Sequence, residues 1–220
     1  MRRLAQPTVI ASATIAAAGS ALLSLPRMLL WTKRPFPVWY AEITIFLGGF
    51  VLWAFVFAWH TEYTRRPIFT WKIKPSLFAA ATLAGVFGAI VLHFFLDASA
   101  RLVTPEDYPP DFGHWVAFTL FALAFTQLFL LYAPFAWLVR LFRNEKIATW
   151  LTVLFGVGVF ALKAHASPQP LPVSMFLELL LVRIVFGFVA IWIYLRGGIL
   201  LISWAGFLVE ARHLLEFATR

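Results

Sequence analysis

The sequence of 220 residues contains no cysteine. This absence excludes disulfides, cysteine nucleophiles, and metal clusters or haem groups held through thiolates. Charge is also scarce, because Asp, Glu, Lys and Arg together make up 13% of the residues, whereas hydrophobic residues make up 62%. A soluble protein of this length must keep a mostly polar exterior. With a mean hydropathy of +0.84, the chain is instead predicted to be a polytopic membrane protein.

Acidic residues are few: 10 Asp and Glu stand against 18 Lys and Arg, which gives a net charge of +8. An excess of this kind is found in proteins that bind nucleic acid. Here, however, the cations lie in short segments between apolar runs, where Lys and Arg fix the orientation of membrane proteins. We therefore expect the lipid bilayer and other membrane subunits, and no nucleic acid, as partners.

Apolar runs of about 20 residues, the length that crosses a bilayer, follow one another along the chain. They predict an all-α fold, a polytopic transmembrane helical bundle of about six to seven spans in a single membrane domain, residues 1–220. An interfacial segment at 27–40, rich in Trp, Lys and Pro, separates the first two spans, and a turn at Arg196–Gly198 separates the last two. The predicted spans are Val9–Leu25, Ile43–Trp59, Leu77–Leu96, Trp115–Val139, Ile147–Leu162, Val173–Leu195 and Ile199–Phe217.

The distribution of Lys and Arg predicts the orientation of these spans, since basic loops stay on the cytoplasmic side. We expect a cytoplasmic N-terminus in a bacterial inner membrane. Under this orientation Arg27, Lys33 and Arg34 fall outside, which leaves open whether the first run spans, re-enters or lies in the membrane plane. The segments assigned to the cytoplasm are 61–76, 140–146 and Arg196, and those assigned to the outside are 97–113 and 165–172.

Arg183 lies about ten residues into a predicted span, close to the middle of the bilayer. An ionisable side chain at that depth costs at least about 2.5 kcal/mol, so it needs polar partners. Two interpretations remain open: a binding or catalytic cavity, or a structural ion pair between Arg183 and one acid, with the histidines in the interface. The predicted buried polar cluster consists of Glu42, His93, Gln127, Glu178, Arg183 and Glu210, with Asp97 as a further acid.

Because the chain has no cysteine, histidines are the nitrogen ligands that could bind a metal or haem. His93, His114 and His60 are the possible cofactor-binding residues, for haem or a pigment. No helix carries His-x3-His or His-Glu-x2-His. Glu210 and His213 share a helix face and would suit a carboxylate-histidine site, but a second such pair is lacking. We therefore predict no metal site from the sequence.

Glycine pairs occur within three of the predicted spans. Small residues let neighbouring helix backbones approach closely in membranes. The sequence therefore predicts close helix contacts at Gly48 and Gly49, Gly85 and Gly88, and Gly156 and Gly158.

The region 115–217 shows an ordered set of segments. An apolar helix containing residues 125–131 leads to a basic turn, the glycine-containing run 154–162 follows, and a helix with Gly187 ends in Tyr194–Gly198 before a last helix. This order and spacing resembles the CAAX-protease and bacteriocin-processing family of intramembrane proteases. The resemblance implies a similar helical bundle.

The resemblance also implies the loss of peptidase activity. The family's paired glutamates and following arginine correspond here to Thr126, Gln127 and Leu131. The family's second motif places a histidine at Ala164, next to His165, and its final helix places polar residues near Phe207 and Glu210. An amide cannot act as the general base that activates water.

The leading functional hypothesis is a non-catalytic accessory or scaffold subunit of a membrane complex. One alternative is an intramembrane hydrolase with a rearranged site, whose catalytic candidates are Glu178, Glu210, His93 and His165. Another is a haem-, quinone- or pigment-binding subunit of an electron-transfer or light-harvesting complex.

Overall fold

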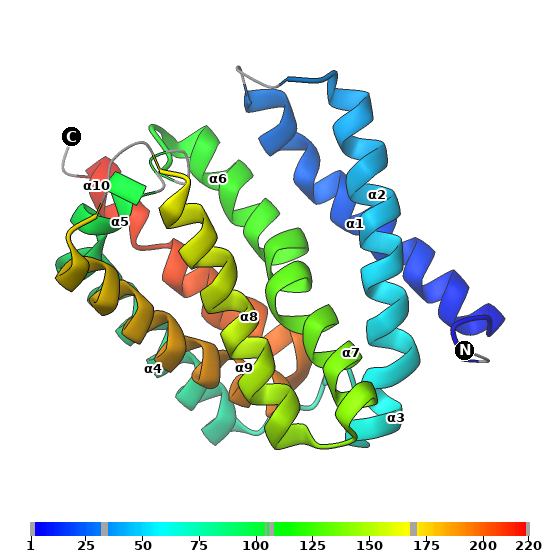
Figure 1. Ribbon diagram of the computed structural model, residues 1–220. Coiled ribbons are helices and arrows are strands. Elements are labelled where there is room, and N and C mark those ends of the chain that lie inside the picture. Colours follow the sequence, from blue (N-terminus) through cyan, green and yellow to red (C-terminus); the bar gives the residue numbers. More distant parts are fainter. Residues whose placement is uncertain (1–2, 32–34, 104, 106–107, 168–170, 219–220) are drawn as a thin grey trace. The chain divides into compact units, whose positions relative to one another are not determined.

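The computed structural model describes the chain except for residues 1–2, 32–34, 104, 106–107, 168–170 and 219–220 (Figure 1). Lys33 and Arg34 of the predicted interfacial segment therefore lie outside the described residues. The described residues are almost all helical and form no strand. The α-helices are α1 (Pro7–Leu30), α2 (Val38–Phe55), α3 (Thr61–Thr64), α4 (Pro75–Val91), α5 (Asp97–Val103), α6 (Phe112–Phe121), α7 (Ala133–Phe142), α8 (Glu145–His165), α9 (Val173–Glu210) and α10 (His213–Ala218).

Short π-helical turns join several of these helices into longer rods. They are η1 (Val56–His60), η2 (Leu92–Leu96), η4 (Ala122–Thr126) and η5 (Leu128–Tyr132). With these turns included, six helices are long and apolar enough to cross a membrane: Pro7–Leu30, Val38–Thr64, Pro75–Leu96, Phe112–Phe142, Glu145–His165 and Val173–Phe217. The predicted all-α membrane bundle is confirmed.

Two prolines lie inside these helices. The predicted first span ends at Leu25, but α1 continues through Pro26 to Leu30. A proline removes one backbone hydrogen bond, which near the end of a helix affects only the last turn. Pro134 is the second residue of α7, just after η5. A π-helical turn alters the backbone bonding pattern at that point.

The helices belong to two compact units, whereas the sequence predicted a single membrane domain. Unit 1 comprises Met1–Ile68 and Gly113–Ala148, and unit 2 comprises Phe69–Phe112 and Thr149–Arg220. In unit 1, α1 packs along α2, and both contact the rod formed by α6, η4, η5 and α7. In unit 2, α4 packs along α9.

The helix α9 reverses direction at Gly198, which has φ 68° and ψ −168°. This backbone conformation is open essentially to glycine alone. Gly88 of α4 contacts the helix on both sides of this reversal. A Cβ added at Gly88 would lie 3.3 Å from Phe186, before Gly198, and 3.2 Å from Val209, after it. Because one residue contacts both arms of α9, the arms run side by side, as the orange and red segments in Figure 1 show. The predicted turn at Arg196–Gly198 is confirmed.

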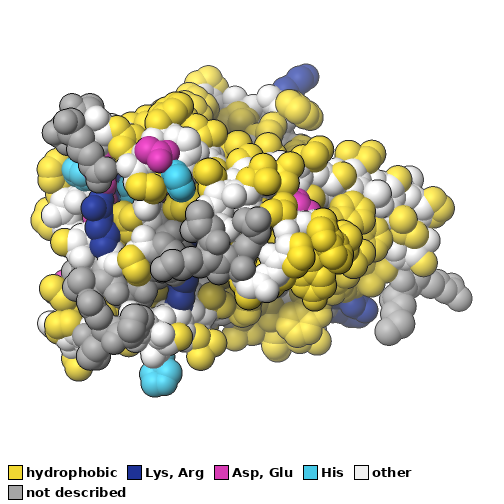
Figure 2. Space-filling model, turned by 90° about the horizontal axis from the view of Figure 1, so that it is seen from above, with side chains coloured by type: hydrophobic (Ala, Val, Ile, Leu, Met, Phe, Trp, Pro, Cys, Tyr) yellow, Lys and Arg dark blue, Asp and Glu magenta, His cyan; other side chains and the backbone are white. Residues whose placement is uncertain are grey.

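Large apolar side chains lie on the outside of the helices. Leu22, Phe95, Leu162 and Val173 are each at least 70% exposed, and hydrophobic side chains cover most of the face in Figure 2. Water would oppose such exposure at about 25 cal/mol per Å², whereas lipid tails do not. The exterior therefore fits an integral membrane protein.

Candidate functional site

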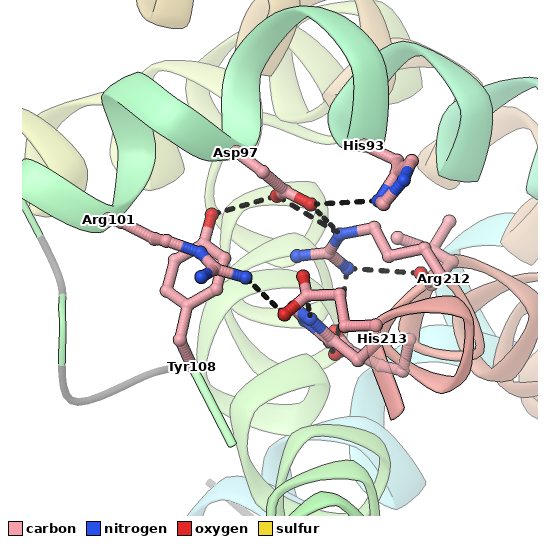
Figure 3. Close-up of polar contacts among 9 residues, drawn as sticks. His93, Asp97, Arg101, Tyr108, Arg212 and His213 are labelled. Carbon is pink, nitrogen blue, oxygen red and sulfur yellow. Dashed lines mark hydrogen bonds and ion pairs between the residues drawn. The ribbon is translucent and has the colours of Figure 1, made fainter. Parts of the chain in front are cut away.

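Buried polar side chains gather in unit 2, where α4 ends and the second arm of α9 ends (Figure 3). Asp97 directly follows the apolar helix Pro75–Leu96, so the group lies at the end of a membrane-crossing helix. We call it the polar cluster. Its members are His93, Asp97, Arg101, Tyr108, Glu210, Arg212, His213 and Glu216.

Helical spacing places these residues on two facing rows. His93, Asp97 and Arg101 follow one another at four-residue intervals along η2 and α5, so they share one face. Glu210, His213 and Glu216 follow at three-residue intervals across the end of α9 and along α10. Figure 3 shows the two rows pointing toward each other.

Asp97 lies at the centre of the polar cluster and is only 5% exposed. Its Oδ1 accepts hydrogen bonds from the Tyr108 hydroxyl at 2.8 Å and from Arg212 Nε at 3.2 Å. Its Oδ2 lies 3.4 Å from Arg212 Nε and 3.7 Å from His93 Nδ1. The Arg212 side chain is itself 11% exposed, so the two opposite charges are desolvated together and compensate each other.

Glu216 forms the second centre. One of its oxygens, Oε2, pairs with Arg101, while Oε1 lies 3.5 Å from His213 Nδ1. The other ring nitrogen of His213 lies 3.8 Å from Glu210 Oε2. The Arg101 guanidinium also lies 4.6 Å from the centre of the Tyr108 ring, a cation–π contact. The cluster therefore joins α5 to α10 through the Arg101–Glu216 pair and to the turn before α10 through the Asp97–Arg212 pair.

Tyr108 lies in the segment between α5 and α6. Burial raises the pKa of its hydroxyl, and the negative charge of Asp97 beside it raises this pKa further. Both effects disfavour the phenolate. Tyr108 is therefore neutral at physiological pH and acts as a hydrogen-bond donor to Asp97.

Two members of the predicted buried cluster, Glu178 and Arg183, are exposed on the first arm of α9, so the prediction that they are buried is wrong. The Arg183 guanidinium lies 4.5 Å from the centre of the Phe160 ring. Their neighbour Leu179 is buried and belongs to the core formed with Leu96 and Phe160. His93 and Glu210 of the same prediction do belong to the polar cluster.

The remaining two members of that prediction, Glu42 and Gln127, lie in unit 1. Glu42 is half-buried on α2, and its Oε1 is buried without a hydrogen-bond partner among the described residues. The side chain of Gln127 accepts a hydrogen bond from the Tyr132 hydroxyl. Of the other two positions that match the protease motif, Thr126 is half-buried in η4 and Leu131 is buried in η5.

Two of the predicted cofactor histidines, His60 and His114, lie in unit 1 and are not neighbours. His60 is buried in unit 1 with its ring 6.1 Å from that of Phe135. His114 lies near the start of the same rod that contains Phe135, about 30 Å away at 1.5 Å per residue, and His93 lies in unit 2. His60 and His114 are therefore too far apart to ligate one haem from both sides. His165 is exposed at the end of α8.

The sequence pointed to His93, Asp97, Glu210 and His213, whereas Arg101, Tyr108, Arg212 and Glu216 were missed. The missed signal is the spacing of His93 and Asp97, an i, i+4 pair that supplies the second helical pair judged to be lacking. Comparisons with known protein families, with curated proteins and with solved structures gave no match.

Proposed function

We propose that the protein is a non-catalytic accessory or scaffold subunit of a membrane complex, in a bacterial inner membrane with its N-terminus in the cytoplasm. The observation that carries the proposal is the state of Gln127. At the position where the resembling protease family uses a glutamate base, this chain has an amide whose oxygen is occupied by the Tyr132 hydroxyl. An amide in that position takes no proton from water.

The positions of the residues proposed for a rearranged catalytic site also support a non-catalytic protein. His165 and Glu178 are exposed on the outside of unit 2, whereas Glu210 faces Arg212 and His213 in the polar cluster. A hydrolase needs its base and acid within hydrogen-bond reach of one substrate position. Two of the candidates face away from the helix core, so they do not contribute to such a position.

The small buried share of the helices favours a role among other membrane subunits. Only 17% of the most apolar window of Pro75–Leu96 is buried within the chain, and the same holds for Val173–Phe217. The remaining apolar surface contacts lipid or the helices of partner subunits. The orientation is supported by the basic residues 61–76 and 140–146, which favour the cytoplasmic side.

Purification in a mild detergent, followed by native mass spectrometry, tests the proposal. We expect a second membrane protein to co-purify at a fixed ratio and to be cross-linked to this chain in intact membranes. A monomer alone, in both the purified sample and the cross-linked membranes, would contradict it.

One observation favours a hydrolase as a second candidate: His93 and Glu210 lie in the same polar cluster as Asp97 and Glu216. Carboxylate and imidazole groups in one site are the usual means of activating water. Cleavage of membrane peptides that is lost in Glu210→Gln and kept in His165→Ala would establish this activity. Absence of cleavage by the wild-type protein would exclude it for those peptides.

A further inference from the structure

We propose that His93, Asp97 and Glu216, with His213 beside Glu216, form a binding site for one divalent transition-metal ion, and that Zn²⁺ is the ion whose chemistry they fit best. The site goes beyond the proposed accessory function. It would join the row on η2 and α5 to the row on α10.

Three possible ligand atoms lie close together. One ligand atom from each of His93, Asp97 and Glu216 lies within 4.8 Å of the others. His213 Nδ1 lies outside this group, but it is 3.5 Å from Glu216 Oε1. Two ligands of a tetrahedral ion, each about 2.1 Å from it, are about 3.4 Å apart. The 3.7 Å between His93 Nδ1 and Asp97 Oδ2 is close to this spacing.

Each carboxylate has both an outer hydrogen-bond donor and an imidazole beside it. Asp97 Oδ1 accepts from Tyr108 and Arg212, and Oδ2 lies 3.4 Å from Arg212 Nε and 3.7 Å from His93 Nδ1. Glu216 directs Oε2 to Arg101 and Oε1 to His213. Carboxylates that bind metals are commonly held by outer hydrogen-bond donors. The arginines and the tyrosine would thus orient the carboxylates toward the ion.

Two imidazole nitrogens of the cluster are buried without a hydrogen bond to a described residue. The His213 side chain is 2% exposed, and its Nδ1 is buried without a hydrogen-bond partner among the described residues. His93 Nδ1 is in the same state. A buried ring nitrogen without a hydrogen bond is costly, and both of these nitrogens face a carboxylate oxygen (Figure 3). A metal ion bound between His93 Nδ1 and Asp97 Oδ2 would give both atoms a partner.

Charge also favours a cation. The cluster contains the carboxylates of Asp97, Glu210 and Glu216 and the guanidinium groups of Arg101 and Arg212. The three carboxylates outnumber the two guanidinium groups. An imidazole nitrogen with two carboxylate oxygens suits Zn²⁺ and other transition metals, whereas Ca²⁺ and Mg²⁺ prefer oxygen ligands alone.

To test the proposal, the full-length protein in detergent is freed of metal with a chelator and then equilibrated with Zn²⁺. The bound zinc is measured by elemental mass spectrometry. We expect about one ion per chain in the wild type and in His165→Ala, which removes an exposed histidine outside the site. In His93→Ala and Glu216→Gln we expect affinity to fall by at least about tenfold. Co²⁺ in place of Zn²⁺ should give the visible absorption of a tetrahedral ion in the wild type and in His165→Ala, and a weaker absorption in His93→Ala and Glu216→Gln.

Folding of the variants is checked by size-exclusion chromatography and helical circular dichroism. Wild-type protein that binds no Zn²⁺ after stripping would overturn the proposal, whatever the variants do. Binding that persists unchanged in folded Glu216→Gln, or that is lost equally in His165→Ala, would overturn it as well. A rise in the melting temperature of the wild type with Zn²⁺, absent in Glu216→Gln, would support it.

Discussion

Arg212 Nε donates to Asp97 Oδ1 at 3.2 Å although the two residues are 115 positions apart in the sequence. The pair joins the start of α5 to the turn between α9 and α10. Both side chains are nearly buried, at 11% and 8% exposure. A buried charge that loses its partner costs far more than an exposed one, so this contact should matter for folding.

The substitution Asp97→Asn should lower the free energy of unfolding by about 3 kcal/mol, because it leaves the Arg212 charge buried without its counter-ion. Equilibrium unfolding in detergent measures the change. Glu178→Gln is the control, since that exposed carboxylate should change stability by less than about 0.5 kcal/mol. Equal effects of the two substitutions would mean that the ion pair does not stabilise the fold.

A second prediction concerns the packing of α4 against α9. A Cβ at Gly85 would lie 2.9 Å from the backbone oxygen of Ala205 and 3.0 Å from Leu208 Cβ. Gly85→Ala should therefore destabilise the protein by about 1 to 3 kcal/mol, measured as the loss of monodisperse protein after heating. Gly158→Ala is the matched control, because no described atom lies within 4 Å of its added Cβ and alanine favours the helix. Greater heat resistance of Gly85→Ala than of the wild type would contradict this packing.

A third prediction concerns unit 1, where Ser20 connects three helical segments. Its Oγ accepts a hydrogen bond from Trp53 Nε1 at 3.0 Å and donates one to the backbone oxygen of Ala124 at 3.1 Å. Ala124 lies in the π-helical turn η4. Serine side chains often satisfy backbone groups of this kind in membranes.

Ser20→Ala removes both bonds and should cost about 1 kcal/mol. The change should also shift the fluorescence of the protein, because the Trp53 indole loses its partner. Thr14→Ala provides the comparison, since its exposed hydroxyl bonds only to Ile10 in the same helix. Fluorescence and stability that are alike in the two variants would argue against the connecting role of Ser20.

The helices were predictable because each apolar run has the length of a bilayer and ends in charged or turn-forming residues. The helix faces that pack against one another were not predictable. Gly85 and Gly88 meet a neighbouring helix, whereas nothing lies within 4 Å of a Cβ added at Gly156 or Gly158. Which face of a helix meets a partner depends on the rotation of the whole helix, and spacing alone does not give that rotation.

The polar cluster was predictable in part for a related reason. Asp97, Glu210 and His213 are distinctive as polar residues at the ends of apolar runs. Arg101 and Glu216 lie beyond those ends, where charges are common, so only the facing of α5 and α10 shows their pairing. Arg183 was misjudged because its place in the span does not show which way its side chain turns, and its guanidinium lies over the Phe160 ring on an exposed part of the helix.

A fourth prediction follows from the raised pKa of Tyr108, which is caused by burial and by the charge of Asp97. In the unfolded chain the phenol titrates near its ordinary value of about 10. Below that pH the hydroxyl is protonated in both states, so it adds no pH dependence. Above it, the unfolded state has lost the proton that the folded state still holds, and stability falls as the pH rises.

The melting temperature of the wild type should therefore decline more steeply between about pH 10 and 11.5 than that of Tyr108→Phe, which lacks the titrating group. At pH 8 the variant should be less stable by about 1 kcal/mol, because Asp97 loses one hydrogen bond. The two melting curves should converge as the pH increases. Parallel curves over this range would show that Tyr108 titrates alike in the folded and unfolded chain, and hence that its hydroxyl does not bond to a buried Asp97.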